Sequence, residues 1–123
     1  MLQYNDTAEN DITEQIQQSG DDRTLRFPTL TRVKTGETIS VRYKTYRIGR
    51  SESVCDYSLK DDRTISREHA EIITKGDNYY IMDKNSTNKT YLNDTELLPM
   101  TEYALKDGDR ITLANEEFIF GCG

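Results

Sequence analysis

The chain has 123 residues and a formal net charge of −6 at pH 7, which is unevenly distributed. The first 22 residues contain six acids and no lysine or arginine, so the other 101 residues hold 16 acidic and 16 basic residues. A neutral body without a basic stripe argues against general nucleic-acid binding. The length corresponds to one domain that can bury a core without disulfides or metals.

No apolar run approaches the roughly 18 residues of a membrane span, and no secretory segment precedes the acidic stretch. We therefore expect a cytoplasmic protein in which Cys55 and Cys122 are reduced thiols. One histidine and two distant cysteines offer no zinc-ligand spacing, and the turns DDR and KDGD lack the alternating acids of a calcium loop. No metal or other cofactor is expected.

Residues 1–22 predict an acidic disordered tail or linker. Ile12 and Ile16 share a helical spacing, but two apolar side chains bury too little surface to hold a helix. The folded domain is expected over 23–123. We expect the chain to be a piece of a longer protein, with any fused domain N-terminal to it.

From residue 26 onward the sequence consists of short strand-like runs separated by turn residues. RFPTLTRV (26–33) and ETISVRY (37–43) flank a hairpin turn in which Gly36 can take a positive φ. The later runs are TYRIG (45–49), YSL (57–59), HAEIIT (69–74), NYYIMD (78–83), TYLN (90–93), ELLP (96–99), RITLA (110–114) and EFIFG (117–121). Because no helical pattern separates these runs, they predict an all-β antiparallel sandwich.

The stretch RTISREHAEI (63–72) places Ser66 near the only histidine, His69. A nucleophile and its general base are one interpretation of this pair. However, no glycine elbow surrounds the serine and no third orienting group can be identified, so we expect no enzymatic activity.

Phosphate recognition uses more of the sequence. The loops GRSES (49–53), TISRE (64–68) and NSTNKT (85–90) supply arginines, hydroxyls and side-chain amides. Guanidinium groups bind phosphate oxygens with charge assistance, and a serine hydroxyl can donate to a further oxygen. An asparagine amide can bind both the N–H and the C=O of an extended peptide.

The order of these elements resembles the forkhead-associated (FHA) domain. The resemblance covers residues 26–121 and is carried by IGR (48–50), ISREHA (65–70), DKNSTNKTYLN (83–93) and LKDGDRI (105–111). It implies an FHA-type (SMAD/FHA-like) sandwich of about eleven strands whose apical loops bind phosphothreonine peptides. The implied phosphopeptide-binding residues are Arg50, Ser66, Arg67, Thr87 and Asn88, and the implied loop-shaping residues are Gly49, His69 and Asn93.

In that resemblance Arg50 and Ser66 contact the phosphate, Arg67 assists, and Asn88 beside Thr87 holds the peptide main chain. Where the family usually has Asn-Gly, this chain has Asn88-Lys89. A lysine with positive φ costs about 1 kcal/mol. Either this loop differs in shape or the strain is tolerated.

We expect a monomeric, phosphothreonine-dependent protein–protein interaction module of bacterial Ser/Thr-kinase signalling. A phosphate-independent scaffold domain of a larger protein, for example of a secretion system, is the alternative. The partner is a phosphothreonine-containing protein or the chain's own phosphorylated tail. In the tail Thr13 is the candidate phosphosite, with Ile16 at its +3 position, and a plain solubilising linker is the alternative there.

Overall fold

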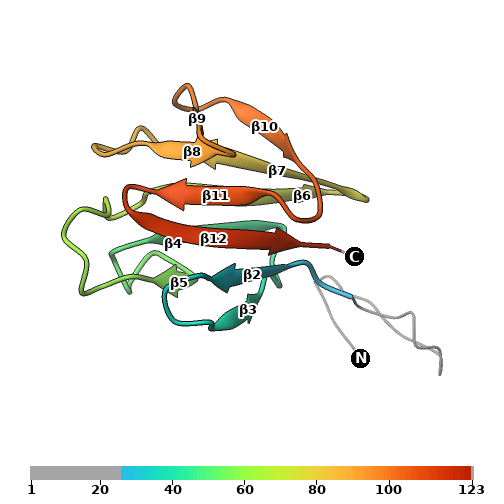
Figure 1. Ribbon diagram of the computed structural model, residues 1–123, viewed down its shortest axis with the longest axis horizontal. Coiled ribbons are helices and arrows are strands. Elements are labelled where there is room, and N and C mark those ends of the chain that lie inside the picture. The colour runs from blue at the N-terminus through green and yellow to red at the C-terminus, as the bar shows by residue number, and fades with distance from the viewer. Residues whose placement is uncertain (1–25, 123) are drawn as a thin grey trace.

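The computed structural model describes residues 26–122, and Thr13 with the whole predicted tail lies outside them. Eleven strands and no helix occur in the described residues (Figure 1). The strands are β2 (Thr29–Arg32), β3 (Thr38–Ser40), β4 (Thr45–Gly49), β5 (Tyr57–Ser58), β6 (Ala70–Lys75), β7 (Asn78–Asp83), β8 (Thr90–Leu92), β9 (Thr95–Glu96), β10 (Glu102–Leu105), β11 (Arg110–Leu113) and β12 (Glu116–Gly121). No helix capable of crossing a membrane is therefore present between residues 26 and 122.

The strands form two sheets that pack face to face. One has five strands in the order β10-β7-β6-β4-β5, and the other has six in the order β3-β2-β12-β11-β8-β9. All pairings are antiparallel except the short contact of β4 with β5, which is parallel. The prediction of an all-β sandwich is confirmed, with one mixed sheet instead of two purely antiparallel ones.

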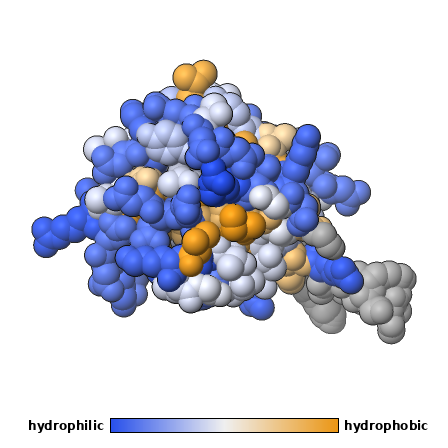
Figure 2. All heavy atoms as spheres, in the orientation of Figure 1, coloured by the Kyte–Doolittle hydropathy of each residue, from blue (hydrophilic) through white to orange (hydrophobic). Residues whose placement is uncertain are grey.

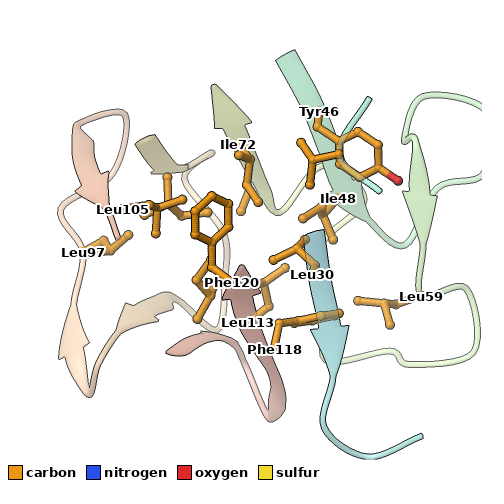
Figure 3. Close-up of a cluster of buried hydrophobic side chains, with 14 of the residues drawn as sticks. Leu30, Tyr46, Ile48, Leu59, Ile72, Leu97, Leu105, Leu113, Phe118 and Phe120 are labelled. Atoms are coloured by element: carbon orange, nitrogen blue, oxygen red, sulfur yellow. The ribbon is translucent and has the colours of Figure 1, made fainter. Parts of the chain in front are cut away.

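The core lies between the sheets and is built from alternate residues of the strands (Figure 3). Ile111 and Leu113 of β11 and Phe118 and Phe120 of β12 are all at most 1% exposed, as their alternation predicts. Leu30 of β2 packs in the same cluster. Each large apolar side chain buried in this way stabilises the fold by about 1.5–3 kcal/mol.

The first hairpin turns where the sequence predicts it. Gly36 has a φ of +77°, and its N–H donates to the Arg32 carbonyl at 2.8 Å. Strand β10 was not predicted. It pairs with β7 from Glu102 opposite Met82 to Leu105 opposite Tyr79, and only Leu105 is buried.

The register of the five-stranded sheet brings three loops to one end of the sandwich. Ile48 near the end of β4 pairs with Ala70 at the start of β6, and Ala70 pairs with Asp83 at the end of β7. The loops that leave these strands project at the left in Figure 1, whereas residues 26 and 122 lie at the opposite end. Figure 2 shows hydrophilic residues over the loop end. Both cysteines are free thiols in the structure.

Candidate functional site

Three loops, 50–56, 59–69 and 84–89, are joined by hydrogen bonds at this end. The N–H groups of Arg50 and Ser51 donate to the carbonyls of Ser66 and Arg67 at 3.0 and 3.2 Å. The Thr87 N–H donates to Ser66 Oγ at 3.0 Å. Together they enclose an open pocket of about 340 Å³, which is lined by Arg50, Arg63, Thr64, Ile65, Ser66, Arg67, Thr87 and Asn88.

All five residues expected to bind a phosphopeptide therefore lie around one pocket. Arg50 is half-buried, and its Nε donates to the Ile65 carbonyl at 3.0 Å, which fixes the side chain. No residue of the described chain accepts a hydrogen bond from its two terminal amino groups. Arg67, Thr87 and Asn88 are exposed.

Ser66 is oriented by its neighbours on both sides. Its Oγ accepts the Thr87 N–H, so the hydroxyl proton is free to be donated. Its own backbone N–H donates to His69 Nδ1 at 3.0 Å. The histidine thus contacts the backbone of Ser66 and not its hydroxyl.

His69 is fully buried and braces two of the loops. Because Nδ1 accepts from Ser66, the ring proton is assigned to Nε2, which donates to the Lys89 carbonyl at 2.9 Å. Burial lowers the pKa of His69, which keeps the ring neutral. With both nitrogens occupied, His69 cannot act as the base for Ser66, and the hydrolase interpretation has no geometric support.

Lys89 resolves the question raised by the missing glycine. Its φ is +70°, in the left-handed region. Its carbonyl accepts hydrogen bonds from His69 Nε2 at 2.9 Å and from the Ala114 N–H at 3.1 Å. The loop keeps the conformation that suits glycine, and the lysine tolerates it.

Asn88 projects from the same loop toward loop 59–69. Its side-chain NH2 donates to the Thr64 carbonyl at 2.8 Å. The amide oxygen accepts no hydrogen bond from the described residues. One half of the amide therefore fixes the pocket wall, and the other half is available to a ligand.

Asp83 is a loop-organising residue to which the sequence assigned no role. Its carboxylate is 1% exposed and accepts hydrogen bonds from the Ser86 N–H (3.0 Å), the Ser86 hydroxyl and the Thr90 hydroxyl (2.7 Å). An acid at the end of the strand-like run NYYIMD (78–83), followed by Ser86 and Thr87, was the available signal. Asp83 determines the shape of loop 84–89 from beneath.

The three loop-shaping residues take different places. A side-chain carbon at Gly49 would lie 2.2 Å from the Arg67 carbonyl oxygen, so only glycine fits between loops 50–56 and 59–69. His69 lies beneath the pocket, as described. Asn93 lies away from it, at the end of β8 that points to the other end of the sandwich. There it accepts the Arg110 N–H at 2.9 Å and donates to Asp109 at 3.0 Å.

No cluster of three or more His, Cys, Asp or Glu side chains that could hold a metal ion occurs between residues 26 and 122. The site is instead composed of donors. Arginine terminal amino groups, a serine hydroxyl and an asparagine amide surround a pocket open to solvent. Such a set can bind a multiply charged anion together with a peptide backbone.

Comparisons with known proteins agree with this geometry. The model of the FHA domain family matches residues 46–114. An oxoglutarate dehydrogenase inhibitor of Corynebacterium jeikeium is 38% identical over 60 residues, which are 49% of this chain and 40% of that protein. The chain spans only 15–40% of the length of the curated relatives it matches.

Solved structures extend the likeness to the fold. Mycobacterium tuberculosis EmbR, in complex with a low-affinity phosphopeptide, is 30% identical with a TM-score of 0.72, covering 77% of this chain and 24% of that one. An FHA domain solved in a study of phosphothreonine-dependent FHA domain interactions is 33% identical, with a TM-score of 0.70. The match covers 80% of this chain and 98% of that one. The family match covers more than half of the 123 residues, so this chain belongs to the FHA domain family.

Proposed function

We propose that this domain binds phosphothreonine-containing segments of partner proteins in Ser/Thr-kinase signalling. The observation that carries the proposal is the set of free donors of Arg50 and Ser66 in one pocket with Arg67. The Arg50 terminal amino groups and the Ser66 hydroxyl bind the phosphate, and Arg67 assists from the rim. The Asn88 amide oxygen accepts a peptide N–H beside Thr87, while Gly49 and His69 shape the pocket loops and Asn93 shapes the turn after β8.

The charge distribution supports an anionic ligand. Within residues 26–122 the side chains of Arg32, Arg47 and Arg110 form ion pairs with Asp or Glu, whereas Arg50, Arg63 and Arg67 form none. Of the five arginines of residues 26–122 without an ion pair, these three line the pocket, whereas Arg26 and Arg42 do not. A dianionic phosphate compensates several of them with charge-assisted hydrogen bonds.

Binding of this kind makes and breaks no covalent bond. One relative is named as an inhibitor of an enzyme, which fits a regulatory binding role better than a catalytic one. Both nitrogens of the only histidine are occupied by hydrogen bonds to the loops. We therefore propose a non-enzymatic adaptor that acts as a monomer in the cytoplasm.

Fluorescence anisotropy with a degenerate phosphothreonine peptide pool and its unphosphorylated counterpart tests the function. Each hydrogen bond to a charged group contributes about 1.5–3 kcal/mol, so Arg50→Ala should weaken binding by roughly 10²–10⁴-fold. Lys106→Ala removes an exposed cation from the opposite end of the sandwich and is the matched control. Equal or absent binding of both pools would favour the phosphate-independent scaffold instead.

We also propose that residues 1–22 are a linker ahead of a domain at 23–123 and that Thr13, when phosphorylated, occupies the pocket. Thr13 and Arg26 are thirteen residue-to-residue steps apart, which can span about 45 Å when extended. A domain of about 100 residues has a radius of gyration of only about 13 Å. Phosphorylation of Thr13 should therefore weaken binding of a separate phosphopeptide through effective concentration, and an unchanged affinity would contradict this.

A further inference from the structure

The end of the sandwich opposite the pocket carries exposed basic and aromatic side chains. Arg26 and Phe27 lie just before β2, and Arg42, Tyr43 and Lys44 lie between β3 and β4. All five are exposed, including the two aromatic rings, at 43% for Phe27 and 56% for Tyr43. These five residues are called the basic-aromatic patch below.

The two segments that form the patch are held side by side. Strands β2 and β3 pair directly, and beyond their ends the Val41 N–H donates to the Pro28 carbonyl at 2.8 Å. The Val41 side chain is 1% exposed and anchors the loop in the core. The Lys44 carbonyl accepts the Thr74 N–H at 2.8 Å. The backbone of the patch is therefore fixed, and ordering it adds little to the cost of binding.

The patch carries positive charge that the described chain does not pair. Arg26, Arg42 and Lys44 form no ion pair with any residue of 26–122. The segments 26–28 and 41–45 contain no acid. The acids of the surrounding segments lie outside ion-pair distance of these three cations, and they are Asp56 before β5, Asp77 in the turn after β6, and Asp107 and Asp109 in the turn after β10.

The segment that precedes the patch in sequence has the opposite charge. Residues 1–22 contain six acids and no lysine or arginine, and Arg23 is the only base before Arg26. Asp22, the last of the six acids, is four residue-to-residue steps from Arg26, which span at most about 14 Å. A partner tethered so closely is present at high effective concentration.

The same segment also offers apolar groups to the two exposed rings. Its large apolar side chains are Leu2, Tyr4, Ile12 and Ile16. Contact with Phe27 and Tyr43 would remove apolar surface of both partners from water. The segment therefore matches the patch in charge, in apolar character and in position along the chain.

We propose that segment 1–22, in its unphosphorylated form, docks on the basic-aromatic patch through its carboxylates. The inference goes beyond the proposed phosphothreonine binding and does not depend on it, because no residue of the pocket takes part. An exposed ion pair contributes little by itself, so docking depends on several pairs, on the tether and on the two rings. Because the patch and the pocket lie at opposite ends of the sandwich, a segment docked there leaves the pocket open.

Cross-linking of the full chain with a water-soluble carbodiimide tests this, because the reagent joins a carboxylate to a lysine amine in contact with it. Lys44 is the only lysine of the patch. Lys106 is the matched control, since it is exposed at the same end and lines a pocket next to the one that Arg26 lines. Mass spectrometry of the digested protein should find acids of residues 1–22 joined to Lys44 at least about threefold more often than to Lys106.

Salt and a charge variant distinguish docking from proximity alone. Raising the salt from about 0.01 to about 1 M shortens the screening length from about 30 to about 3 Å and should abolish the preference for Lys44. Arg42→Gln should reduce the cross-links to Lys44 by about threefold, whereas Lys34→Gln, at the loop end, should leave them unchanged. Equal coupling to Lys44 and Lys106, or a preference that survives both high salt and Arg42→Gln, overturns the docking. Neither result bears on phosphothreonine binding, which the anisotropy assay decides, so the two proposals can fail separately.

Discussion

Replacing Lys89 by glycine should stabilise the domain. Lys89 has a φ of +70°, and its carbonyl is held by hydrogen bonds from His69 and from Ala114. The left-handed conformation costs an L-residue roughly 1–2 kcal/mol. Glycine adopts it without strain but gives the unfolded chain more freedom, which offsets about 0.5–1 kcal/mol. The free energy of unfolding should therefore rise by about 0.5–1 kcal/mol.

Equilibrium unfolding in urea of the wild type, Lys89→Gly and Lys89→Ala measures this effect. Alanine removes the ammonium group and the long side chain but keeps the carbon that clashes in the left-handed conformation, so its stability should match the wild type within about 0.5 kcal/mol. The glycine variant should unfold at a higher urea concentration with an unchanged slope. If Lys89→Gly is no more stable than Lys89→Ala, the argument from backbone strain is refuted.

Three further changes probe the groups beneath the pocket. Gly49→Ala should lower the free energy of unfolding in urea by at least about 2 kcal/mol, because the new carbon would lie 2.2 Å from the Arg67 carbonyl oxygen. A variant as stable as the wild type would show that the two loops move apart easily. Asp83→Asn should lower the free energy of unfolding by about 2–4 kcal/mol, because an amide cannot accept all three hydrogen bonds from Ser86 and Thr90. It should also weaken phosphopeptide binding measured by anisotropy. Retained affinity would show that loop 84–89 needs no such support. Burial lowers the pKa of His69 below its ordinary 6.5. Below pH 6.5 the unfolded chain therefore binds more protons than the folded protein does. The free energy of unfolding should decline as the pH falls from 6.5 until it passes the folded-state pKa of His69. His69→Gln should lose this part of the decline when unfolding is compared at about pH 7.5 and about pH 5, and an equal decline in both proteins would contradict it.

Most of the strands could be predicted because their alternation is visible in the sequence. Ile111 with Leu113 and Phe118 with Phe120 indicate one buried face each, and the structure buries all four. Strand β10 escaped notice because only Tyr103 and Leu105 turn inward over four residues. So short an alternation acquires meaning only through pairing with β7.

The sequence predicted which residues lie at the candidate site, but not the hydrogen bonds between them. The order of the motifs named Arg50, Ser66 and Asn88, and one pocket gathers them. The sequence could not show that His69 contacts the backbone of Ser66, since spacing does not reveal which atom a ring faces. Arg63 was missed for a similar reason. Its position at the rim of the pocket depends on the turn that Asp62 and Thr64 form.

The residues that hold the shape of the loops, such as Asp83 and His69, are different from the exposed residues that face a ligand. The groups that hold the loops are buried beneath the pocket, whereas Arg63, Arg67 and Thr87 are exposed. Substitutions at exposed positions away from structural hydrogen bonds usually change stability by less than about 0.5 kcal/mol. If the pocket binds phosphopeptides as proposed, we expect that few surface replacements change the partner and that a library randomised at Arg63 and Arg67 yields binders of chosen phosphoproteins.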